Sequence, residues 1–279
     1  MATTALPWLT WDGDLASLPC FVINLNPEGQ RWAYVQKKVA PLLPKLERFP
    51  GVDGRLITDD ELKKDARVAV SLRARIIDKE RRWKHEEMDN KSGIGCALSH
   101  IKLWKHIVQR NHPLTLVMED GVQFDESNLR KVKQAFSRIS NQSHLSDKSV
   151  WFLNHKWYEP HTPLATDDKA CEFMISQFHI GMQAYIITQT AAQELLKHAL
   201  PVEFHIDHFV TKMTRLQVIQ TVTHPNIVTG RNRFQSTIGH SVPMCDIHWG
   251  MMILCIVIVS VLFVCGVTGL LRKGGSTRD

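Results

Sequence analysis

Two adjacent carboxylates, Glu119 and Asp120, are the residues whose position points most directly to chemistry. They follow a short apolar run, Leu114 to Met118, that is typical of a buried strand. Carboxylates at the end of a buried strand cost free energy unless they meet a cation or hydrogen-bond donors. A divalent metal held between carboxylate and diphosphate oxygens would meet that need. The alternative is an ordinary Glu-Asp-Gly turn pointing into water, and the pair alone does not decide between them.

Other polar side chains follow the ends of other predicted strands. Asn24 ends the first apolar run and is followed by Asn26 and Arg31, whereas Asn154 and His155 end a later run. Ligands of open α/β sheets bind beyond the carboxyl ends of the strands. These residues are therefore candidates for a single site together with the two carboxylates.

The strands that would position these residues are short apolar runs bounded by polar or turn residues. Continuous apolar runs of this length indicate central, parallel strands that are buried on both faces. The four predicted strands are Cys20 to Leu25, Leu114 to Met118, Val150 to Asn154 and Ala184 to Thr188.

Helical patterns lie between the predicted strands. Residues 94–110 carry a broad apolar face, and Thr190 to Gln193 resembles a capping box that opens a helix through Ala199, before Pro201. The charged stretch 59–90 predicts solvated helix and loop, and 141–148 and 160–169 predict loops. Strands that alternate with helices indicate an α/β fold.

Composition narrows the classes of partner. The 279 residues suit one domain with appendages, and the net charge of +6 fits nucleic acid, anionic lipid or a phosphate-bearing substrate. No nucleic-acid motif is present, so we expect no nucleic-acid partner. The six cysteines form no CxxC pair, which argues against a zinc site and favours free thiols in a reducing compartment.

The segment 249–271 contains no charged residue and is followed by Arg272 and Lys273. A bilayer-spanning helix needs roughly 20 apolar residues, so the segment predicts a single C-terminal transmembrane helix. A buried core helix is the alternative, but the run has no polar stripe to face solvent. Because residues 1–18 do not resemble a secretory signal, we expect a tail-anchored, single-pass membrane protein with its domain in the cytosol.

Several motifs, in order over residues 20 to 240, resemble those of glycosyltransferase family 25. That family includes bacterial lipooligosaccharide galactosyltransferases and animal collagen galactosyltransferases. The matching residues are Phe21 to Leu25, Arg31, Gly51 to Gly54, Gly95 to His100, Leu103-Trp104, Leu116 to Asp120, Ala184 to Thr188, Ala192, Leu195-Leu196, Pro201, Asp207 and Ser236 to Ile238.

The resemblance implies a GT-A-type, Rossmann-like domain that binds a UDP-sugar, commonly UDP-galactose, with Mn²⁺ or another divalent cation. The implied reaction inverts the sugar carbon and transfers a hexose to a hydroxyl of an unidentified glycan, lipid or protein. Together with the uncharged C-terminal segment, the predicted organisation is an extension at 1–18, a glycosyltransferase domain at 19–240, a linker at 241–248, the membrane helix at 249–271 and a basic tail at 272–279.

Residue roles follow from the matched motifs. Asp120 and Glu119 would bind the metal. Asp207 would be the catalytic base or a second-sphere partner of the metal, and Glu119 is the other candidate for the catalytic carboxylate. The implied donor-binding residues are Asn24, Arg31, Asp53, Gly54, Ser99 and His100. Some have plainer alternatives: Arg31 as a surface helix residue, Asp53-Gly54 as a turn, and His100 as a core histidine. His205 and His208 flank Asp207 and would either bind metal or be exposed.

The sequence departs from the family pattern at two glycines. Gly121 replaces the second aspartate of the usual Leu-Glu-Asp-Asp, and Gly93 stands where glutamate is common. In an extended chain, side chains 119 and 121 point to one face and 120 to the other, so Asp120 does not simply replace a lost carboxylate at 121. Either the turn redirects Asp120, or Asp125 takes over, or metal binding is weakened. A catalytically silent transferase-like binding or scaffold protein is therefore the alternative function.

Overall fold

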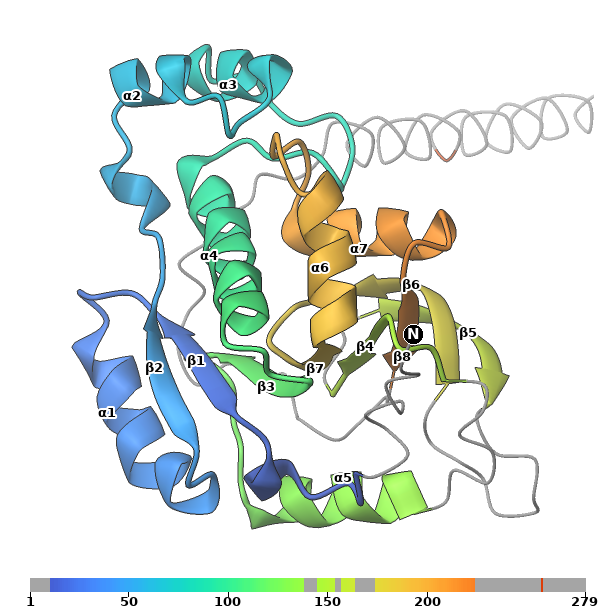
Figure 1. Ribbon diagram of the computed structural model, residues 1–279. Helices are drawn as coiled ribbons and strands as arrows, with labels where there is room; N and C mark the ends of the chain where they lie inside the picture. Colours follow the sequence, from blue (N-terminus) through green and yellow to red (C-terminus); the bar gives the residue numbers. More distant parts are fainter. Residues whose placement is uncertain (1–10, 138–144, 154–156, 164–173, 224–256, 258–279) are drawn as a thin grey trace, which may run out of the picture.

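The computed structural model describes residues 11–137, 145–153, 157–163, 174–223 and the single residue 257. These residues form an eight-stranded sheet, in the order β2-β1-β3-β7-β4-β8-β6-β5, with helices packed on both faces (Figure 1). The predicted mixture of strands and helices is confirmed as a mixed α/β fold.

The elements have the following bounds. The strands are β1 (Cys20–Asn24), β2 (Leu46–Pro50), β3 (Leu114–Glu119), β4 (Ser149–Phe152), β5 (Trp157–Pro163), β6 (Met174–Ile180), β7 (Ala184–Thr188) and β8 (Gln220–Thr223). The helices are α1 (Gly29–Lys38), α2 (Asp59–Lys64), α3 (Val70–Ile77), α4 (Lys91–Gln109), α5 (Glu126–Ser137), α6 (Gln189–His198) and α7 (Ile206–Arg215). Single 3₁₀ turns are η2 (Leu15–Ser17), η3 (Ala40–Leu42) and η4 (Gly54–Leu56).

All four predicted strands are present, but one of them runs against the prediction. Strands β2, β1 and β3 are mutually parallel, and β7 pairs antiparallel with both β3 and β4. A continuous apolar run reports burial on both faces of a sheet, which a central antiparallel strand shares. The run therefore could not give the direction of β7. The loop prediction for 160–169 was also wrong at its start, because residues 160–163 belong to β5.

Strand alternation divides the apolar core into two layers. On β3, Val117 packs toward α4 and α6, whereas Leu116 and Met118 pack on the opposite face with α1 and α5. Because successive side chains of a strand point to opposite faces, this division continues to the residues at the strand end. The same alternation gives the side chains of Glu119 and Asp120 opposite directions at the end of β3.

The predicted helix at 94–110 is confirmed as α4, which begins one turn earlier because the Asn90 side chain accepts a hydrogen bond from Gly93 N. The predicted capping box at Thr190 was wrong. The Thr188 hydroxyl accepts from Ala191 N as the chain leaves β7, so α6 begins at Gln189 and Thr190 lies in its first turn. Solvated helix and loop at 59–90 are confirmed, with α2 and α3 in that stretch.

The predicted membrane helix at 249–271 lies outside the described residues, apart from Val257. In the part of the chain that the structure describes, no helix combines the length and apolar character needed to cross a bilayer. Asn154 and His155, proposed above as strand-end polar residues, are also outside the described residues.

Candidate functional site

A cleft opens beyond the carboxyl ends of β1 and β3. It encloses about 750 Å³ of space, part of it open to solvent. Its walls are Ile23, Leu25, Glu28, Arg31, Val52, Asp53, Gly54, Arg55, Ser92, Cys96, Ser99, His100, Glu119, Asp120 and Gly121. All of the predicted site residues line this cleft except Asn24 and Asp207. Parallel neighbouring strands thus place segments far apart in sequence at one edge, as strand-end ligand sites require.

Glu119 and Asp120 point to opposite sides of the sheet. Glu119 turns toward α4, where its Oε1 lies 3.4 Å from His100 Nε2. Asp120 turns toward α1, where its Oδ1 accepts a hydrogen bond from Arg31 Nη1 at 3.0 Å. The alternation expected from an extended chain is therefore preserved beyond the end of β3. The turn does not bring the two carboxylates together.

Asp120 is a buried carboxylate with both oxygens engaged. Asn24 Nδ2 donates to Oδ2 at 2.6 Å, and Arg31 donates to Oδ1. Burial raises the pKa of Asp120, and the hydrogen bonds from Asn24 and Arg31 oppose that rise. The arrangement can keep a charged carboxylate inside the protein because a cation and an amide both face it.

Asn24 lies beneath the cleft rather than in its wall. The side chain is buried, and its amide also donates to the Glu28 carbonyl at 3.3 Å while its Oδ1 accepts from Arg48 Nε at 2.8 Å. Asn24 therefore positions Asp120 and the start of α1. Both polar atoms of the Asn24 amide are already hydrogen-bonded within the protein. Direct contact of Asn24 with a nucleotide stays a prediction.

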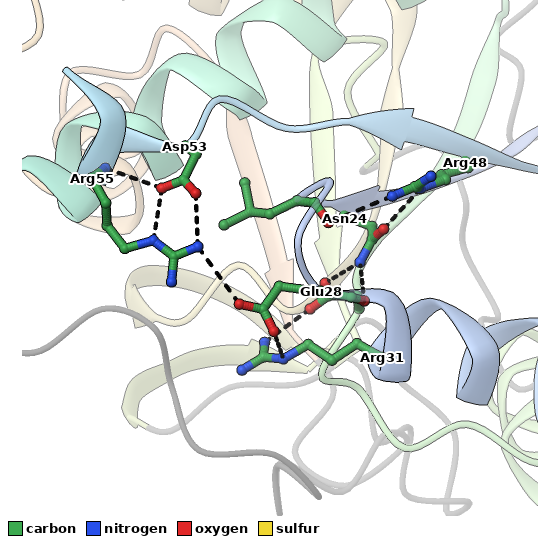
Figure 2. A network of polar contacts seen from close by, with 8 residues as sticks. Asn24, Glu28, Arg31, Arg48, Asp53 and Arg55 are labelled. Atoms are coloured by element: carbon green, nitrogen blue, oxygen red, sulfur yellow. Dashed lines mark hydrogen bonds and ion pairs between the residues drawn. The ribbon is translucent and has the colours of Figure 1, made fainter.

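Two arginines face the cleft across a carboxylate. Figure 2 shows Glu28 between Arg31 and Arg55, and the ion-pair distances are 3.5 Å to Arg31 Nε and 3.6 Å to Arg55 Nη2. Arg55 also holds Asp53 through two hydrogen bonds of 2.8 and 2.7 Å. The guanidinium beside Asp53 lowers the pKa of that carboxyl. Guanidinium groups at such a position are well suited to bind phosphate oxygens.

Two glycines let the loop before η4 lie directly on α4. A Cβ on Gly54 would stand 1.8 Å from the carbonyl oxygen of Lys91, and one on Gly95 would stand 2.4 Å from Gly54 N. Ser99 completes the junction, since its Oγ accepts from Val52 N at 2.8 Å and donates to Gly95 O at 2.7 Å. The two family motifs that carry these glycines thus meet in space, and Ser99 acts there as a loop anchor.

His100 is fully buried and belongs to a chain of polar contacts. Its Nδ1 lies 2.9 Å from the hydroxyl of Tyr185, which also accepts a hydrogen bond from Trp104 Nε1 at 3.0 Å. Its other ring nitrogen faces Glu119. Cys96, one turn earlier on α4, completes a group whose donor atoms lie within 4.8 Å of one another. Burial first, and then the charges of Glu119 and Asp207, raise the pKa of the Cys96 thiol well above its usual value.

Asp207 lies in the first turn of α7 and does not line the cleft. Its Oδ2 accepts from Gly181 N at 3.1 Å and its Oδ1 accepts from His208 N at 2.9 Å. The carboxylate thus ties the turn before β7 to α7, near enough to influence Cys96. His205 precedes α7 and packs beside Gly93, and the His208 ring lies edge-on to Phe178. Neither histidine lines the cleft, and a catalytic role for Asp207 stays a prediction.

Of the two predicted metal ligands, Glu119 and Asp120, the geometry of the cleft fits only Glu119. Both Asp120 oxygens already accept hydrogen bonds, Gly121 has no side chain, and Asp125 is engaged with Ser127 and Asn128 at the start of α5. Glu119 is the carboxylate of the pair that can face a cation in the cleft. Acidic side chains still outnumber basic ones there: the carboxylates are Glu28, Asp53, Glu119 and Asp120, and the guanidinium groups are Arg31 and Arg55.

Sequence reasoning missed several residues of this cleft. Glu28 and Arg55 each had a local signal, because Glu28, the residue before α1, is three residues before Arg31 and Arg55 is two residues after Asp53. The i, i+4 spacing of Cys96 and His100 predicts that both lie on one helix face, but it gave Cys96 no role in the site. Tyr185 had no such signal, because its contact with His100 joins residues 85 apart in sequence.

A mixed sheet with a polar cleft at its strand ends fits a Rossmann-like glycosyltransferase fold. The family model for glycosyltransferase family 25 (LPS biosynthesis protein) matches residues 17–210. The chain therefore belongs to glycosyltransferase family 25, and the family resemblance noted in the sequence is confirmed.

Named relatives are similar over part of the chain. A glycosyltransferase 25 family member of Aedes aegypti is 31% identical over 114 residues, 41% of this chain and 18% of that protein. Procollagen galactosyltransferase 2 of Homo sapiens is 23% identical over 176 residues, 63% of this chain and 27% of that protein. The inactive glycosyltransferase 25 family member 3 of Mus musculus is 24% identical over 179 residues, 63% of this chain and 28% of that protein. The matches thus span less than a third of each relative's length.

Proposed function

We propose that this chain is a GT-A-type transferase that moves a hexose, galactose in the first instance, from a UDP-sugar to a hydroxyl of a glycan, lipid or protein. The observation that carries the proposal is the convergence of the family motifs on one cleft. Residues of the β1 end, α1, the loop before η4, α4 and the β3 end all line it. Relatives named procollagen galactosyltransferase support galactose as the sugar to test first.

In the proposed reaction, Arg31 and Arg55 bind the diphosphate of the donor. The acceptor oxygen attacks the anomeric carbon from the side opposite the diphosphate, so the new carbon–oxygen bond forms as the bond to phosphate breaks. A cleft carboxylate takes the acceptor proton, and UDP leaves with the bonding electrons. Glu119 is our first choice for that carboxylate because it lines the cleft, and Asp207 is the second.

A divalent cation, Mn²⁺ by family resemblance, stays part of the proposal. Glu119 would hold it together with diphosphate oxygens, and it would offset negative charge on the departing UDP. The excess of carboxylates over guanidinium groups in the cleft supports a cation there. Because Asp120 is already paired with Arg31, the protein would supply few ligands to the cation.

The test is calorimetric titration of the full chain with UDP and with UDP-galactose, each with and without Mn²⁺, followed by a UDP-release assay across several UDP-sugars. We expect Arg31→Ala to weaken UDP binding about tenfold or more, because it removes a charge-assisted contact. Arg130→Ala is the matched control, since Arg130 is exposed on α5 and pairs with the exposed Glu126. No UDP binding by the wild type would overturn the proposal.

A catalytically silent binding or scaffold protein is the second candidate. Two observations favour it: Gly121 removes a motif carboxylate, and one similar mouse protein is named as inactive. The same titrations separate the two candidates. Tight UDP binding with no UDP release from any UDP-sugar, with or without Mn²⁺, would select the silent binder.

Membrane attachment through residues 249–271 is likewise a proposal, supported by the uncharged composition of the segment. Alkaline carbonate extraction of membranes should leave the full chain in the pellet. Release into the supernatant would contradict the anchor, and protease protection in sealed vesicles would show whether the domain faces the cytosol, as predicted.

A further inference from the structure

A chain of buried polar contacts lies behind Glu119, and it determines which ring nitrogen of His100 carries the hydrogen. Trp104, His100 and Tyr185 are fully buried, and the Tyr185 hydroxyl lies between the indole and the imidazole. An indole Nε1 can only donate a hydrogen bond, so Tyr185 Oη must accept from Trp104. What remains to be decided is the direction of the bond between Tyr185 and His100.

The hydroxyl has one hydrogen, and that hydrogen needs an acceptor. Among the described residues, the polar contacts of Tyr185 Oη are those with Trp104 and His100. If His100 Nδ1 also donated, the tyrosine hydrogen would be left buried without a partner, which costs free energy. Burial raises the pKa of Tyr185, so the hydroxyl keeps its hydrogen across the ordinary pH range. The satisfied arrangement has Tyr185 donating to His100 Nδ1.

We infer that Trp104 and Tyr185 fix His100 as its Nε2–H tautomer, and that His100 is a positioning residue that donates to Glu119 and orients it toward the cleft. This inference deepens the proposed function and rests on it for the role of Glu119. One carboxylate oxygen, Oε1, is held from behind by His100 at 3.4 Å. The other oxygen is left for a ligand hydroxyl, the acceptor proton or a cation.

The cluster of Cys96, His100 and Glu119 can be interpreted as a metal site or as a hydrogen-bonded group. The donor atoms of Cys96, His100 and Glu119 lie close enough to hold a metal ion. Metal binding by His100 Nε2 would require that nitrogen to lose its hydrogen, which would move the hydrogen to Nδ1 and break the arrangement at Tyr185. The tautomer therefore makes His100 a hydrogen-bond donor to Glu119 and not a ligand of a three-residue metal cage.

Solid-state nuclear magnetic resonance of the full chain, labelled with ¹⁵N at histidine, measures the tautomer directly. Protonated and bare ring nitrogens have well-separated shifts, and the signals of His100 are assigned by their loss in His100→Gln. We expect His100 to show a hydrogen on Nε2 and none on Nδ1, and to keep this state when excess Zn²⁺ is added. A hydrogen on Nδ1, or a metal-bound Nε2 with Zn²⁺, would overturn the inference.

Two sets of variants test the positioning role. Tyr185→Phe should give His100 a mixture of tautomers, whereas Tyr34→Phe on α1, which does not line the cleft, should leave His100 unchanged. His100→Gln can still donate toward Glu119, so it should keep UDP-galactose affinity within about threefold of the wild type, while His100→Leu should lose about tenfold. Equal losses of UDP-galactose affinity in His100→Gln and His100→Leu would mean that His100 contributes only packing. That result would overturn the positioning role.

The two kinds of measurement separate this inference from the proposed function. The tautomer is read from the protein without any donor or acceptor. Absence of UDP-galactose binding in the wild type would therefore reject the proposed function while the state of His100 is still decided by its spectrum.

Discussion

The cleft has two walls that accommodate carboxylates in different ways. On the β1 side, which we call the ionic wall (Glu28, Arg31, Asp53, Arg55 and Asp120), the carboxylates face guanidinium groups. On the α4 side, the neutral wall (His100 and Glu119, backed by Trp104 and Tyr185), a single carboxylate faces a buried chain of hydrogen-bonded side chains. Adjacent residues of one strand end thus enter opposite environments.

The two walls offer different chemical groups to the proposed reaction. Guanidinium groups of the ionic wall can bind a diphosphate, because they carry positive charge and their donor geometry matches phosphate oxygens. The neutral wall holds Glu119 through one oxygen without cancelling its charge, which suits a group that must accept a proton or a cation.

The junction of the two walls should be the most sensitive point. Gly54→Ala places a methyl group against the backbone of Lys91 and should cost about 3 kcal/mol of folding free energy, with loss of UDP binding. Gly29→Ala is the matched control, because a Cβ there meets nothing within 4 Å, and it should stabilise the chain by about 0.5 kcal/mol. Urea unfolding monitored by tryptophan fluorescence measures both, and equal stabilities would show that the loop can move off α4.

The ionic wall should give a distinctive pH dependence. Since burial raises the folded-state pKa of Asp120 above its ordinary value of 3.8, folding favours the protonated form. That contribution to stability is fully present below pH 3.8 and is lost as pH rises through the folded-state pKa. Asp120→Asn, which does not titrate, should therefore gain stability relative to the wild type as pH rises through that window.

Urea unfolding of wild type and Asp120→Asn from acid to neutral pH tests this sign. Asp125→Asn is the control for an aspartate outside the cleft. Hydrogen bonds from Ser127 lower the pKa of Asp125, so its contribution is present above the ordinary pKa and is lost as pH falls. The two variants should thus change with pH in opposite directions, and a parallel change would remove the special environment assigned to Asp120.

The smallest expected effect concerns Glu28, which lies between the two arginines. Its carboxylate competes with an incoming diphosphate, so Glu28→Gln should raise UDP affinity about threefold, the range of a partly exposed ion pair. Glu126→Gln, which removes the exposed partner of Arg130 on α5, should leave the affinity unchanged. Weaker UDP binding by Glu28→Gln would mean that Glu28 holds the arginines in their binding position rather than blocking them.

Local patterns in the sequence predicted much of the architecture around the cleft. Apolar runs located β1, β3, β4 and β7, and the two-residue period of a strand predicted that Glu119 and Asp120 would face opposite ways. Ordered family motifs identified the family and most residues of the cleft wall. These signals are local, because periodicity and motif spacing depend on residues that are close together in the sequence.

The tertiary structure sets the direction of β7 and the partners of each carboxylate. Arg31 meets Asp120 across 89 positions of sequence, and Tyr185 meets His100 across 85. It also placed Asn24 beneath the cleft and Asp207 outside it, although both had been assigned to the site. Such contacts depend on the order and direction of strands in the sheet, which bring distant segments together and leave no periodic trace in the chain.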